Sequence, residues 1–314
     1  MINLDARVVA DALPYAQLID ALDEAFRSDV EVPQRVHHEV AVPGKRTATL
    51  LLMSAWRRGA TLGVKVATIF PDNATVSLPA VHASYLLLDA TTGAPLAILD
   101  GAELTLRRTA CASALASRYL SRADSRQLLM VGTGSLAPHM IAAHAAARPI
   151  DNVCIWGRRV EAARSVAAVT RTTGLAAEVT EDLREAVSHA DVICCATMAV
   201  EPLIEGEWLR EGQHLDLVGA YTPAMREADS AAVGRAEVYV DTYAGALAEA
   251  GEIVQAIAEG ALGRAEIRGE LAELARGTSS GRTSDDSITL FKSVGTAVED
   301  LAAAELAIKN SGAD

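Results

Sequence analysis

A glycine-rich segment in the middle of the chain has the spacing of a dinucleotide-binding loop. Residues 131–137 read Val-Gly-Thr-Gly-Ser-Leu-Ala, the pattern G-x-G-x-x-A, between a strand-like segment and a helical one. Such glycines let the backbone turn toward a pyrophosphate, and the following helix offers free N–H groups and the positive end of its dipole. The segment predicts a dinucleotide site, with a tight turn that binds nothing as the alternative. The loop residues expected to contact the cofactor are Gly132, Thr133, Gly134, Ser135 and Leu136.

The end of the next predicted strand indicates which dinucleotide is preferred. Sites that prefer NADH usually carry an acidic side chain there, which accepts hydrogen bonds from the ribose hydroxyls. In this chain Gly157 is followed by Arg158 and Arg159, and the first acid is Glu161. A guanidinium can bind the 2′-phosphate of NADPH through two N–H groups. We therefore expect both arginines to bind the cofactor and NADPH to be preferred, with NADH possible.

Three cations outside this region lie in settings that suit a bound carboxylate. Only four of the 28 basic residues are lysines, and one of them, Lys65, interrupts an apolar strand-like segment. Arg35 lies two residues after a proline, and Arg108 lies near the start of an alanine-rich helical segment. Burying a lysine costs free energy unless it has a partner. Lys65 either extends to solvent along its apolar stem or converges with Arg35 and Arg108 on a substrate carboxylate.

The elements that must position these residues follow two patterns. Residues 8–27 and 103–121 have helical spacing, and the strand-like segments between them predict an antiparallel sheet. From residue 126 onward, short apolar segments alternate with helical ones, which is typical of a doubly wound α/β domain. The expected strands are 36–42, 47–53, 62–69, 82–88, 94–99, 127–131, 152–156, 176–179, 191–196, 214–218 and 238–241. A glycine- and serine-rich loop at 277–286 and a last helix from about 287 to 309 complete the prediction.

The composition limits the classes of partner. The chain has 314 residues, half of them apolar, and a formal net charge of −13. Such an acidic protein repels phosphate backbones, so we expect neither a nucleic acid nor an anionic membrane as partner. No apolar run reaches the ~18 residues of a membrane span, and the first residues lack a signal-peptide pattern. The four cysteines form no metal-ligand spacing, so we expect buried reduced thiols, no metal and a cytoplasmic protein.

Several spaced motifs resemble the ornithine cyclodeaminase/mu-crystallin family over nearly the whole chain. They occur in the order in which the family has them. The motifs are Asp100-Gly101-Ala102-Glu103-Leu104-Thr105, Arg108-Thr109-Ala110, Gly132-Thr133-Gly134, Ala190-Asp191-Val192-Ile193, Gly212-Gln213-His214, Val218-Gly219-Ala220, Arg226-Glu227, Gly281-Arg282 and Phe291-Lys292-Ser293.

The resemblance implies an α/β fold in which a Rossmann-type doubly wound parallel sheet accompanies an α+β substrate and dimerisation domain. Residues 1–120 with 287–314 would form the substrate and dimerisation domain of a homodimer, and residues 121–286 the dinucleotide-binding domain. The resemblance also implies that Arg35, Lys65 and Arg108 bind an amino- or imino-acid carboxylate. Further cofactor contacts are implied for Thr109, Thr197, Tyr221 and Ser293, in addition to the glycine loop and Arg158.

The family contains several chemistries, which differ at the segment after Gly219. Ornithine cyclodeaminases carry an acid at the position of Tyr221, and a neutral phenol is a poor base at pH 7. The segments 70–73, 78–82 and 219–223 look more like bacterial Δ1-pyrroline-2-carboxylate and Δ1-piperideine-2-carboxylate reductases. We therefore expect NAD(P)H-dependent reduction of a small cyclic imino acid to L-proline or L-pipecolate. Lys65 and Arg108 are its expected catalytic residues, and His82 is a weaker candidate for substrate binding and proton donation.

Two alternatives remain open. One is a lyase of the same family, either an ornithine cyclodeaminase or a cis-3-hydroxyproline dehydratase. The other is a non-catalytic protein that keeps NADPH as a structural ligand and holds a small carboxylate. Ring size is not decided either, since one methylene changes binding in a pocket by only ~1–3 kcal/mol.

Overall fold

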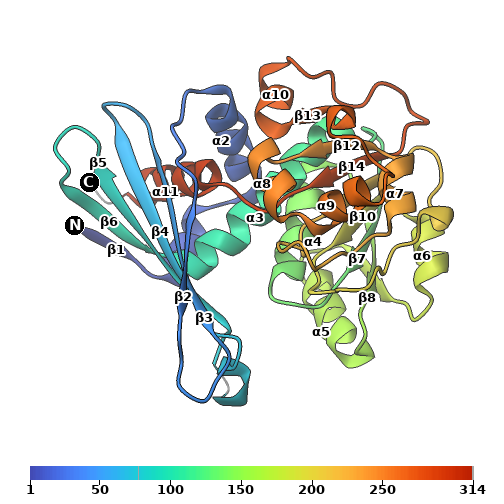
Figure 1. Cartoon of the computed structure of the whole chain (residues 1–314), viewed down its shortest axis with the longest axis horizontal. Helices are drawn as coiled ribbons and strands as arrows, with labels where there is room; N and C mark the ends of the chain where they lie inside the picture. The colour runs from blue at the N-terminus through green and yellow to red at the C-terminus, as the bar shows by residue number, and fades with distance from the viewer. Residues whose placement is uncertain (77, 313–314) are drawn as a thin grey trace. The chain divides into compact units, whose positions relative to one another are not determined.

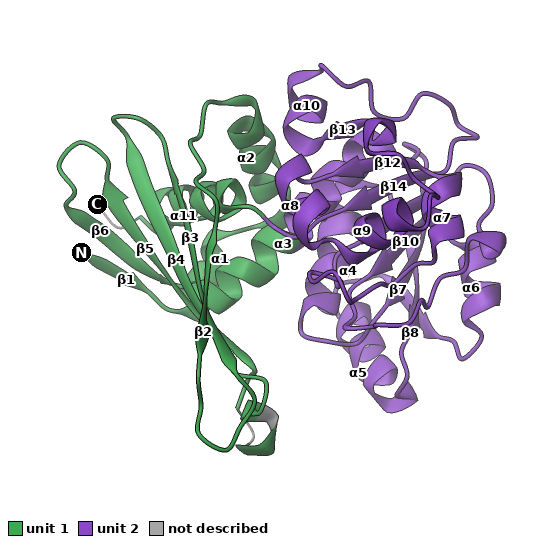
Figure 2. Ribbon diagram, in the orientation of Figure 1, with its two compact units in different colours: residues 1–109, 296–314 green, residues 110–295 purple. Residues whose placement is uncertain are grey.

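The structure is a computed structural model of the chain and describes residues 1–76 and 78–312. It divides into two compact units (Figure 1). Unit 1 comprises Met1–Thr109 together with Thr296–Asp314, and unit 2 comprises Ala110–Gly295 (Figure 2). Within the described ranges, no helix combines the length and apolar character needed to cross a membrane.

Unit 1 is built on a six-stranded sheet with the order β1-β6-β5-β4-β3-β2. The pair β1–β6 is parallel, and the other neighbours are antiparallel. The strands are β1 (Ile2–Leu4), β2 (Val36–Val40), β3 (Ala48–Trp56), β4 (Thr61–Ile69), β5 (Val81–Asp89) and β6 (Pro95–Asp100). Lys65 in β4 lies opposite Met53 in β3 and Tyr85 in β5. Directly opposed residues point to the same face of a sheet, so these three side chains form one row.

Helices cover the face of this sheet that carries Lys65. The helices of unit 1 are α1 (Ala6–Ala12), α2 (Tyr15–Arg27) and α11 (Ala297–Ser311), with a short 3-10 helix at Asn73–Val76. Helix α11 contacts β3, β4 and β5, while α2 packs on α11 and α1 contacts β6. The hydrogen bond from Lys65 to Asp300 shows that α11 lies on the Lys65 face. The opposite face carries exposed aliphatic side chains, among them Val36, Val66 and Ile98.

Unit 2 contains an eight-stranded, entirely parallel sheet with the order β13-β12-β14-β11-β10-β7-β8-β9. The strands are β7 (Gln127–Val131), β8 (Asn152–Trp156), β9 (Ala176–Val179), β10 (Val192–Cys195), β11 (His214–Leu217), β12 (Glu237–Val240), β13 (Gly269–Glu270) and β14 (Thr289–Lys292). The chain winds outward from β7 in both directions, toward β9 on one side and β11 on the other. The topological switch point therefore lies between β7 and β10, which is where open α/β sheets bind their ligands. The expected fold class is confirmed.

The helices of unit 2 connect these strands. They are α4 (Leu136–Ala147), α5 (Val160–Arg171), α6 (Leu183–His189), α7 (Ser230–Arg235), α8 (Tyr243–Glu249), α9 (Gly251–Ala258) and α10 (Leu271–Arg276), with 3-10 turns at Gly206–Trp208 and Arg264–Glu266. All residues of β10, β11 and β14 are buried. This pattern fits central strands that are covered on both faces.

Two details of the predicted secondary structure are wrong. The helix expected at 8–27 is two helices, because Pro14 has no N–H to continue the first one. The last helix was expected from about 287, but Thr289–Lys292 form β14 between β11 and β12, and α11 begins at Ala297. A short apolar segment is ambiguous between buried strand and helix.

The boundaries between the two parts shift accordingly. The division falls after Thr109, inside α3 (Gly101–Leu120), and after Gly295, rather than at 120/121 and 286/287. The second half of α3 belongs to unit 2 because it packs there, as the hydrogen bond from Ser113 to Asp216 in β11 shows. Strand β14 belongs to unit 2 because it completes the parallel sheet.

Candidate functional site

The glycine loop leaves the carboxyl end of β7 at the switch point. Gly132 has φ +124° and donates its N–H to the carbonyl of Trp156 at 3.0 Å. A Cβ at this position would lie 2.6 Å from the carbonyl oxygen of Ala196 and 3.3 Å from Cγ2 of Thr197. Only glycine fits both the left-handed backbone and the close approach. The loop is therefore held against the segment that follows β10.

The other side of the loop is open. Gly134 and Ser135 are exposed, and a Cβ at Gly134 would meet no atom within 4 Å. Ser135 occupies the N-cap position of α4 but makes no side-chain cap hydrogen bond. The first N–H groups of a helix lack partners within the helix, and together with its dipole they suit an anion. Leu136 begins α4, and Thr133 packs on Gly157 at the end of β8, where a Cβ would lie 2.5 Å from Thr133 Cγ2.

Arg158 and Arg159 follow β8 and are exposed. Arg159 takes the N-cap position of α5. The nearest following acid, Glu161, forms an ion pair with Arg164 on the same helix. The end of β8 thus presents guanidinium groups to solvent, at the place in the Rossmann fold where the ribose of a dinucleotide lies.

A buried carboxylate joins the segments that follow β10 and β11. Glu227 Oε1 accepts hydrogen bonds from the N–H of Thr197 at 2.6 Å and from its hydroxyl at 2.8 Å. Glu227 Oε2 accepts from the N–H of Gly219 at 2.7 Å. The side chain of Glu227 is fully buried. Burial raises the pKa of Glu227 to about 7; the nearby Lys292 acts against this rise and Glu252 adds to it.

The remaining expected cofactor residues lie around the same edge or in unit 1. Tyr221 follows Gly219 and exposes 38% of its surface. Ser293 directly follows β14, is buried, and donates its N–H to the carbonyl of Leu217. Thr109 is half-buried and lies on α3 as the last residue of the first segment of unit 1. The structure therefore gathers the glycine loop, Thr197 and Ser293 at the carboxyl ends of the parallel strands.

In unit 1, Lys65 and Arg108 converge on two acids of α11. Lys65 Nζ lies 2.9 Å from Asp300 Oδ1 and 2.8 Å from Oδ2. Arg108 Nε lies 2.8 Å from Asp300 Oδ1, and Arg108 Nη1 donates to Glu299 Oε2 at 2.5 Å. All four side chains are at least 93% buried. The hypothesis that Lys65 extends to solvent is wrong, because the ammonium is enclosed and paired.

The charges of Lys65, Arg108, Glu299 and Asp300, called the quartet below, together determine how readily Lys65 loses its proton. Burial and the nearby charge of Arg108 lower the pKa of Lys65 to about 8, although Asp300 opposes both effects. Burial acts to raise the pKa of Asp300, but Arg108 and Lys65 outweigh it and hold that pKa below its ordinary value. The pKa of Arg108 is raised because the two carboxylates outweigh its burial. Two cations therefore face two carboxylates, and the ammonium loses its proton more readily than an ordinary lysine.

Arg35 and His82 lie differently relative to this quartet. Arg35 lies just before β2, whose first residue, Val36, is aligned with Leu52 in β3. Leu52 is next to Met53, which is aligned with Lys65. His82 in β5 is aligned with Thr68, three residues beyond Lys65, and it is exposed. Side chains alternate between the faces of a strand, so His82 lies on the face opposite Lys65. The structure does not bring His82 together with Lys65 and Arg108.

The sequence pattern did not indicate a role for Glu299 and Asp300, which pair with the cations of unit 1, or for Glu227 in unit 2. Glu299 and Asp300 lie in the first turn of α11, where acids are common because they complement the helix dipole. Glu227 lies in a loop, in a motif that carried the family resemblance without a role. The available signal for Asp300 was an adjacent pair of acids at the start of an alanine-rich helix.

A third polar cluster lies inside unit 2. His144, Cys194 and Asp216 each place a possible ligand atom within 4.8 Å of the others, although no metal-ligand spacing had suggested it. Asp216 accepts from Ser113 Oγ at 2.9 Å and lies 3.1 Å from His144 Nε2. These hydrogen bonds account for the burial of the carboxylate. None of the four cysteines, all of which the structure describes, forms a disulfide; Cys111, Cys194 and Cys195 are buried and Cys154 is partly buried.

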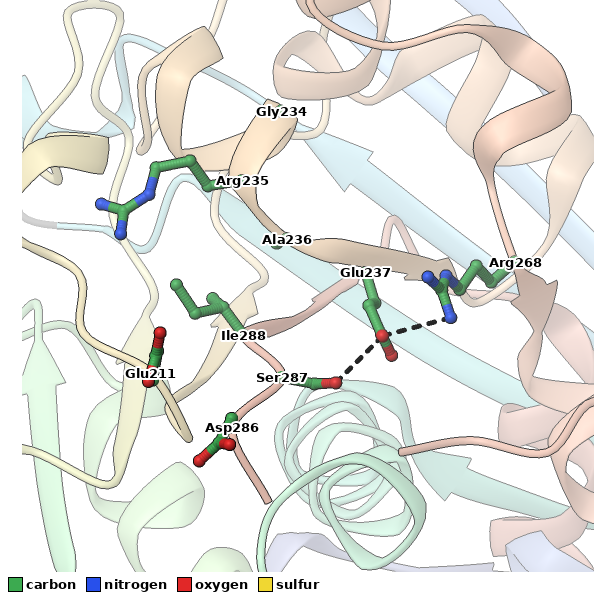
Figure 3. A pocket seen from close by; sticks show the side chains of 9 residues that line it. All are labelled: Glu211, Gly234, Arg235, Ala236, Glu237, Arg268, Asp286, Ser287 and Ile288. Atoms are coloured by element: carbon green, nitrogen blue, oxygen red, sulfur yellow. Dashed lines mark hydrogen bonds and ion pairs between the residues drawn. The ribbon is translucent and has the colours of Figure 1, made fainter. Parts of the chain in front are cut away.

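One surface pocket of unit 2 lies away from the expected site. Residues at the starts of β12, β13 and β14 line it, among them Glu237, Ser287 and Arg268 (Figure 3). Arg268 forms an ion pair with Glu237, which also accepts from Ser287. The strands are parallel, so this pocket is at their amino ends, opposite the edge that carries the glycine loop.

Unit 2 has a parallel sheet with a glycine loop at its switch point, which defines a Rossmann-type dinucleotide-binding protein. Unit 1 is a second unit with a mostly antiparallel sheet, in which two buried cations form ion pairs with carboxylates. The chain belongs to the ornithine cyclodeaminase/mu-crystallin family, whose model matches residues 1–312. The expected family membership is confirmed.

Relatives within this family are similar over nearly their whole length. The chain is 38% identical over 316 residues to the Δ1-pyrroline-2-carboxylate reductase of Colwellia psychrerythraea, with 98% of each chain covered. It resembles the structure of Thermococcus litoralis Δ1-pyrroline-2-carboxylate reductase in complex with NADH and L-proline, with 33% identity, a TM-score of 0.93 and coverage of 99% and 97%. It also resembles an archaeal alanine dehydrogenase dimer with bound NAD, with 29% identity, a TM-score of 0.91 and coverage of 99% and 96%.

Proposed function

We propose that the protein is an NAD(P)H-dependent ketimine reductase that converts Δ1-pyrroline-2-carboxylate, Δ1-piperideine-2-carboxylate or both to L-proline and L-pipecolate. The observation that carries this proposal is the pair of buried cations Lys65 and Arg108, in a chain that is 38% identical over 98% of its length to a relative named as a Δ1-pyrroline-2-carboxylate reductase. Tyr221 supports a reductase over a cyclodeaminase, because a phenol is a poor base at neutral pH and does not replace a catalytic carboxylate.

Arg35, Lys65 and Arg108 bind the carboxylate of the imino acid in this proposal. Lys65 and Arg108 are already balanced by Glu299 and Asp300, so the quartet alone has no net charge. Arg35 is the third cation proposed to contact the carboxylate. A guanidinium and an ammonium held by buried carboxylates are fixed before the substrate arrives, which lowers the entropy cost of orienting it.

Lys65 is the proposed proton donor to the ring nitrogen. The dinucleotide supplies the hydride that adds to the imine carbon. The nitrogen must carry a proton for this step, and a lysine with a pKa of about 8 is largely protonated at neutral pH yet gives up its proton readily. Arg108 retains its proton at all ordinary pH values and serves to hold the carboxylate.

NADPH is the proposed preferred cofactor, with NADH accepted. The glycine loop fits a pyrophosphate because Gly132 leaves no room for a Cβ and the N-terminus of α4 is open. Arg158 and Arg159 would bind the 2′-phosphate, and no acid competes for the ribose there. Thr109, Thr133, Ser135, Leu136, Thr197, Tyr221 and Ser293 are the further proposed contacts.

We also propose a homodimer formed through the open face of the unit 1 sheet. Val36, Val66, Leu96 and Ile98 expose between 36% and 45% of their surface on this face. Contiguous exposed apolar area of this kind marks an interface between proteins. A cytoplasmic location is proposed because NAD(P)H is available there and the four cysteines are free thiols.

A single assay tests the proposed reaction against its alternatives. The protein is mixed with NADPH and Δ1-pyrroline-2-carboxylate, and nicotinamide absorbance and proline formation are followed together. We expect consumption of NADPH with an equal amount of L-proline formed. No consumption, but product from L-ornithine or cis-3-hydroxyproline, would assign a lyase instead. If none of these compounds is turned over, the result would favour the non-catalytic ligand-binding protein.

A further inference from the structure

We propose that Glu227 is a positioning residue of the dinucleotide site, where its carboxylate fixes the segment after β10 against the segment after β11. The inference rests on the proposed function, because it assigns the dinucleotide to the edge of the sheet where Thr197, Gly219 and the glycine loop meet. Glu227 itself is fully buried and does not need to touch the cofactor.

The hydrogen bonds of Glu227 join two loops that are separate in the sequence. One carboxylate oxygen accepts from the N–H and hydroxyl of Thr197, and the other accepts from the N–H of Gly219. Both oxygens are therefore used by backbone N–H groups of different loops. A carboxylate forms such bonds about twice as strongly as a neutral acceptor. No neutral side chain of similar shape accepts from both loops at once.

Thr197 transmits this position to the glycine loop. A Cβ at Gly219 would lie 1.9 Å from the carbonyl oxygen of Thr197 and 2.4 Å from its nitrogen. On its other side, Cγ2 of Thr197 lies 3.3 Å from the place of a Cβ at Gly132. Thr197 is thus packed between two glycines, one on each loop. A shift of Thr197 away from Glu227 would change the space beside the glycine that lets the backbone approach a pyrophosphate.

A second carboxylate and a lysine hold Glu227 in place. Glu252, in the first turn of α9, accepts from the N–H of Glu227 at 2.7 Å. Lys292 at the end of β14 lies 3.1 Å from the other oxygen of Glu252. Glu252 and Lys292 expose at most 1% of their surface. Lys292 also precedes Ser293, a proposed cofactor contact, so the trio links β10, β11 and β14.

The trio of Glu227, Glu252 and Lys292 has one negative charge more than it can balance when both acids are ionised. The groups that face Glu227 are Lys292 from β14, Glu252 from α9, and Thr197, Cys194 and Cys195 from the β10 segment. Burial raises the pKa of the Cys195 thiol well above its ordinary value, so it stays neutral. The pKa of Glu227 is about 7. Protonation replaces one acceptor lone pair by an O–H, which weakens the link between the loops.

The test compares the variant Glu227→Gln with the control variant Asp191→Asn, which replaces a carboxylate at the other end of β10. Asp191 precedes β10 and accepts from the backbone N–H groups of Arg126 and Gln127, so it also joins two neighbouring strands. It lies at the amino ends of the strands, away from the glycine loop. Asp191→Asn therefore reports the general effect of replacing such a carboxylate by an amide.

Binding of NADH is measured by fluorescence titration at pH 8, together with the thermal midpoint and the KM for the imino acid. NADH is chosen because it lacks the 2′-phosphate, whose own ionisation falls near pH 6. We expect Glu227→Gln to raise the Kd for NADH at least tenfold, about 1.4 kcal/mol, with the KM for the imino acid within twofold. Asp191→Asn should leave the Kd within twofold even where its thermal midpoint falls.

The unmodified protein gives a second readout that does not depend on a variant folding. Its Kd for NADH should rise as the pH falls from 8 to 6, and Glu227→Gln should show a flat profile. A flat profile in the unmodified protein, or an equal change in Kd for both variants, overturns the role of Glu227. Failure of the unmodified protein to bind either NADH or NADPH at pH 8 overturns both this role and the proposed function. Imine reduction with an unaffected Glu227→Gln overturns the positioning role alone.

Discussion

Lys65 Nζ lies 2.8 Å from Asp300 Oδ2, although 235 positions separate the two residues in the sequence. Strand β4 and helix α11 meet through this contact, so the C-terminal helix completes a charged cluster on the N-terminal sheet. Asp300 also lies 2.8 Å from Arg108 Nε, which makes it the shared partner of both cations. The orientation of the proposed substrate-binding cations is therefore determined by a residue from the far end of the chain.

Asp300→Asn should shift the alkaline limb of the activity profile toward lower pH. The carboxylate raises the pKa of Lys65 against burial, so its removal lowers that pKa below about 8. If protonated Lys65 is the acid in catalysis, kcat/KM of the unmodified enzyme falls as the pH rises through about 8, and the variant loses activity at a lower pH. Steady-state rates between pH 6 and 10 measure the shift.

Glu305→Gln is the matched control for this variant. Glu305 is on the same helix and forms an ion pair with Arg57 instead. Its substitution removes a comparable charge from α11 without touching Lys65. An unchanged limb in Asp300→Asn, or the same shift in both variants, would contradict a role of Asp300 in setting the Lys65 pKa.

Lys65→Ala and Arg108→Ala should each lower kcat/KM for the imino acid by at least ~100-fold, about 2.7 kcal/mol. Each substitution removes a proposed contact to the substrate carboxylate and leaves a buried carboxylate of α11 with one cation fewer. Lys45→Ala, at an exposed position, serves as the control and should be within twofold of the unmodified enzyme. Kinetics at a temperature where circular dichroism shows each variant to be folded separate this loss from unfolding. Near-normal kcat/KM in a folded Lys65→Ala variant would exclude it from the site.

Local sequence pattern was enough to propose two parts of the candidate site. The G-x-G-x-x-A spacing located the loop at Gly132, and a rare lysine among apolar strand residues located Lys65, because both signals lie within a few residues. The pairing of Lys65 with Asp300 could not be predicted, since it depends on where α11 packs. His82 shows the same limit, because its face follows from the register of β5 against β4, and a strand pattern alone does not give register.

The central sheet shows a further limit of local pattern. Strand β14 lies between β11 and β12 but follows both in the chain. Its four buried residues have no period that distinguishes a strand from a helix, and the insertion is a long-range pairing. Ser293 was nevertheless expected at the cofactor from the family resemblance, and β14 explains how it comes to the carboxyl edge of the sheet.

Arg158→Ala should raise the KM for NADPH at least tenfold and change the KM for NADH by less than threefold. The exposed guanidinium would bind the 2′-phosphate through charge-assisted hydrogen bonds, and NADH has no such group. Arg164→Ala is the control, since Arg164 is an exposed arginine on the following helix that pairs with Glu161. KM values for both cofactors at saturating imino acid decide the point, and equal changes for NADPH and NADH would remove Arg158 from the specificity site.

Val66→Glu should convert the proposed dimer into a monomer. Val66 exposes 40% of its surface on the open face of the unit 1 sheet, and a buried carboxylate there would have no partner in the interface. Light scattering after gel filtration should give about twice the 32.9 kDa chain mass for the unmodified protein and a single chain mass for the variant. Val169→Glu, at a valine that is 51% exposed on α5, is the control and should remain dimeric. A dimeric Val66→Glu variant would place the interface elsewhere, and a monomeric unmodified protein would contradict the dimer itself.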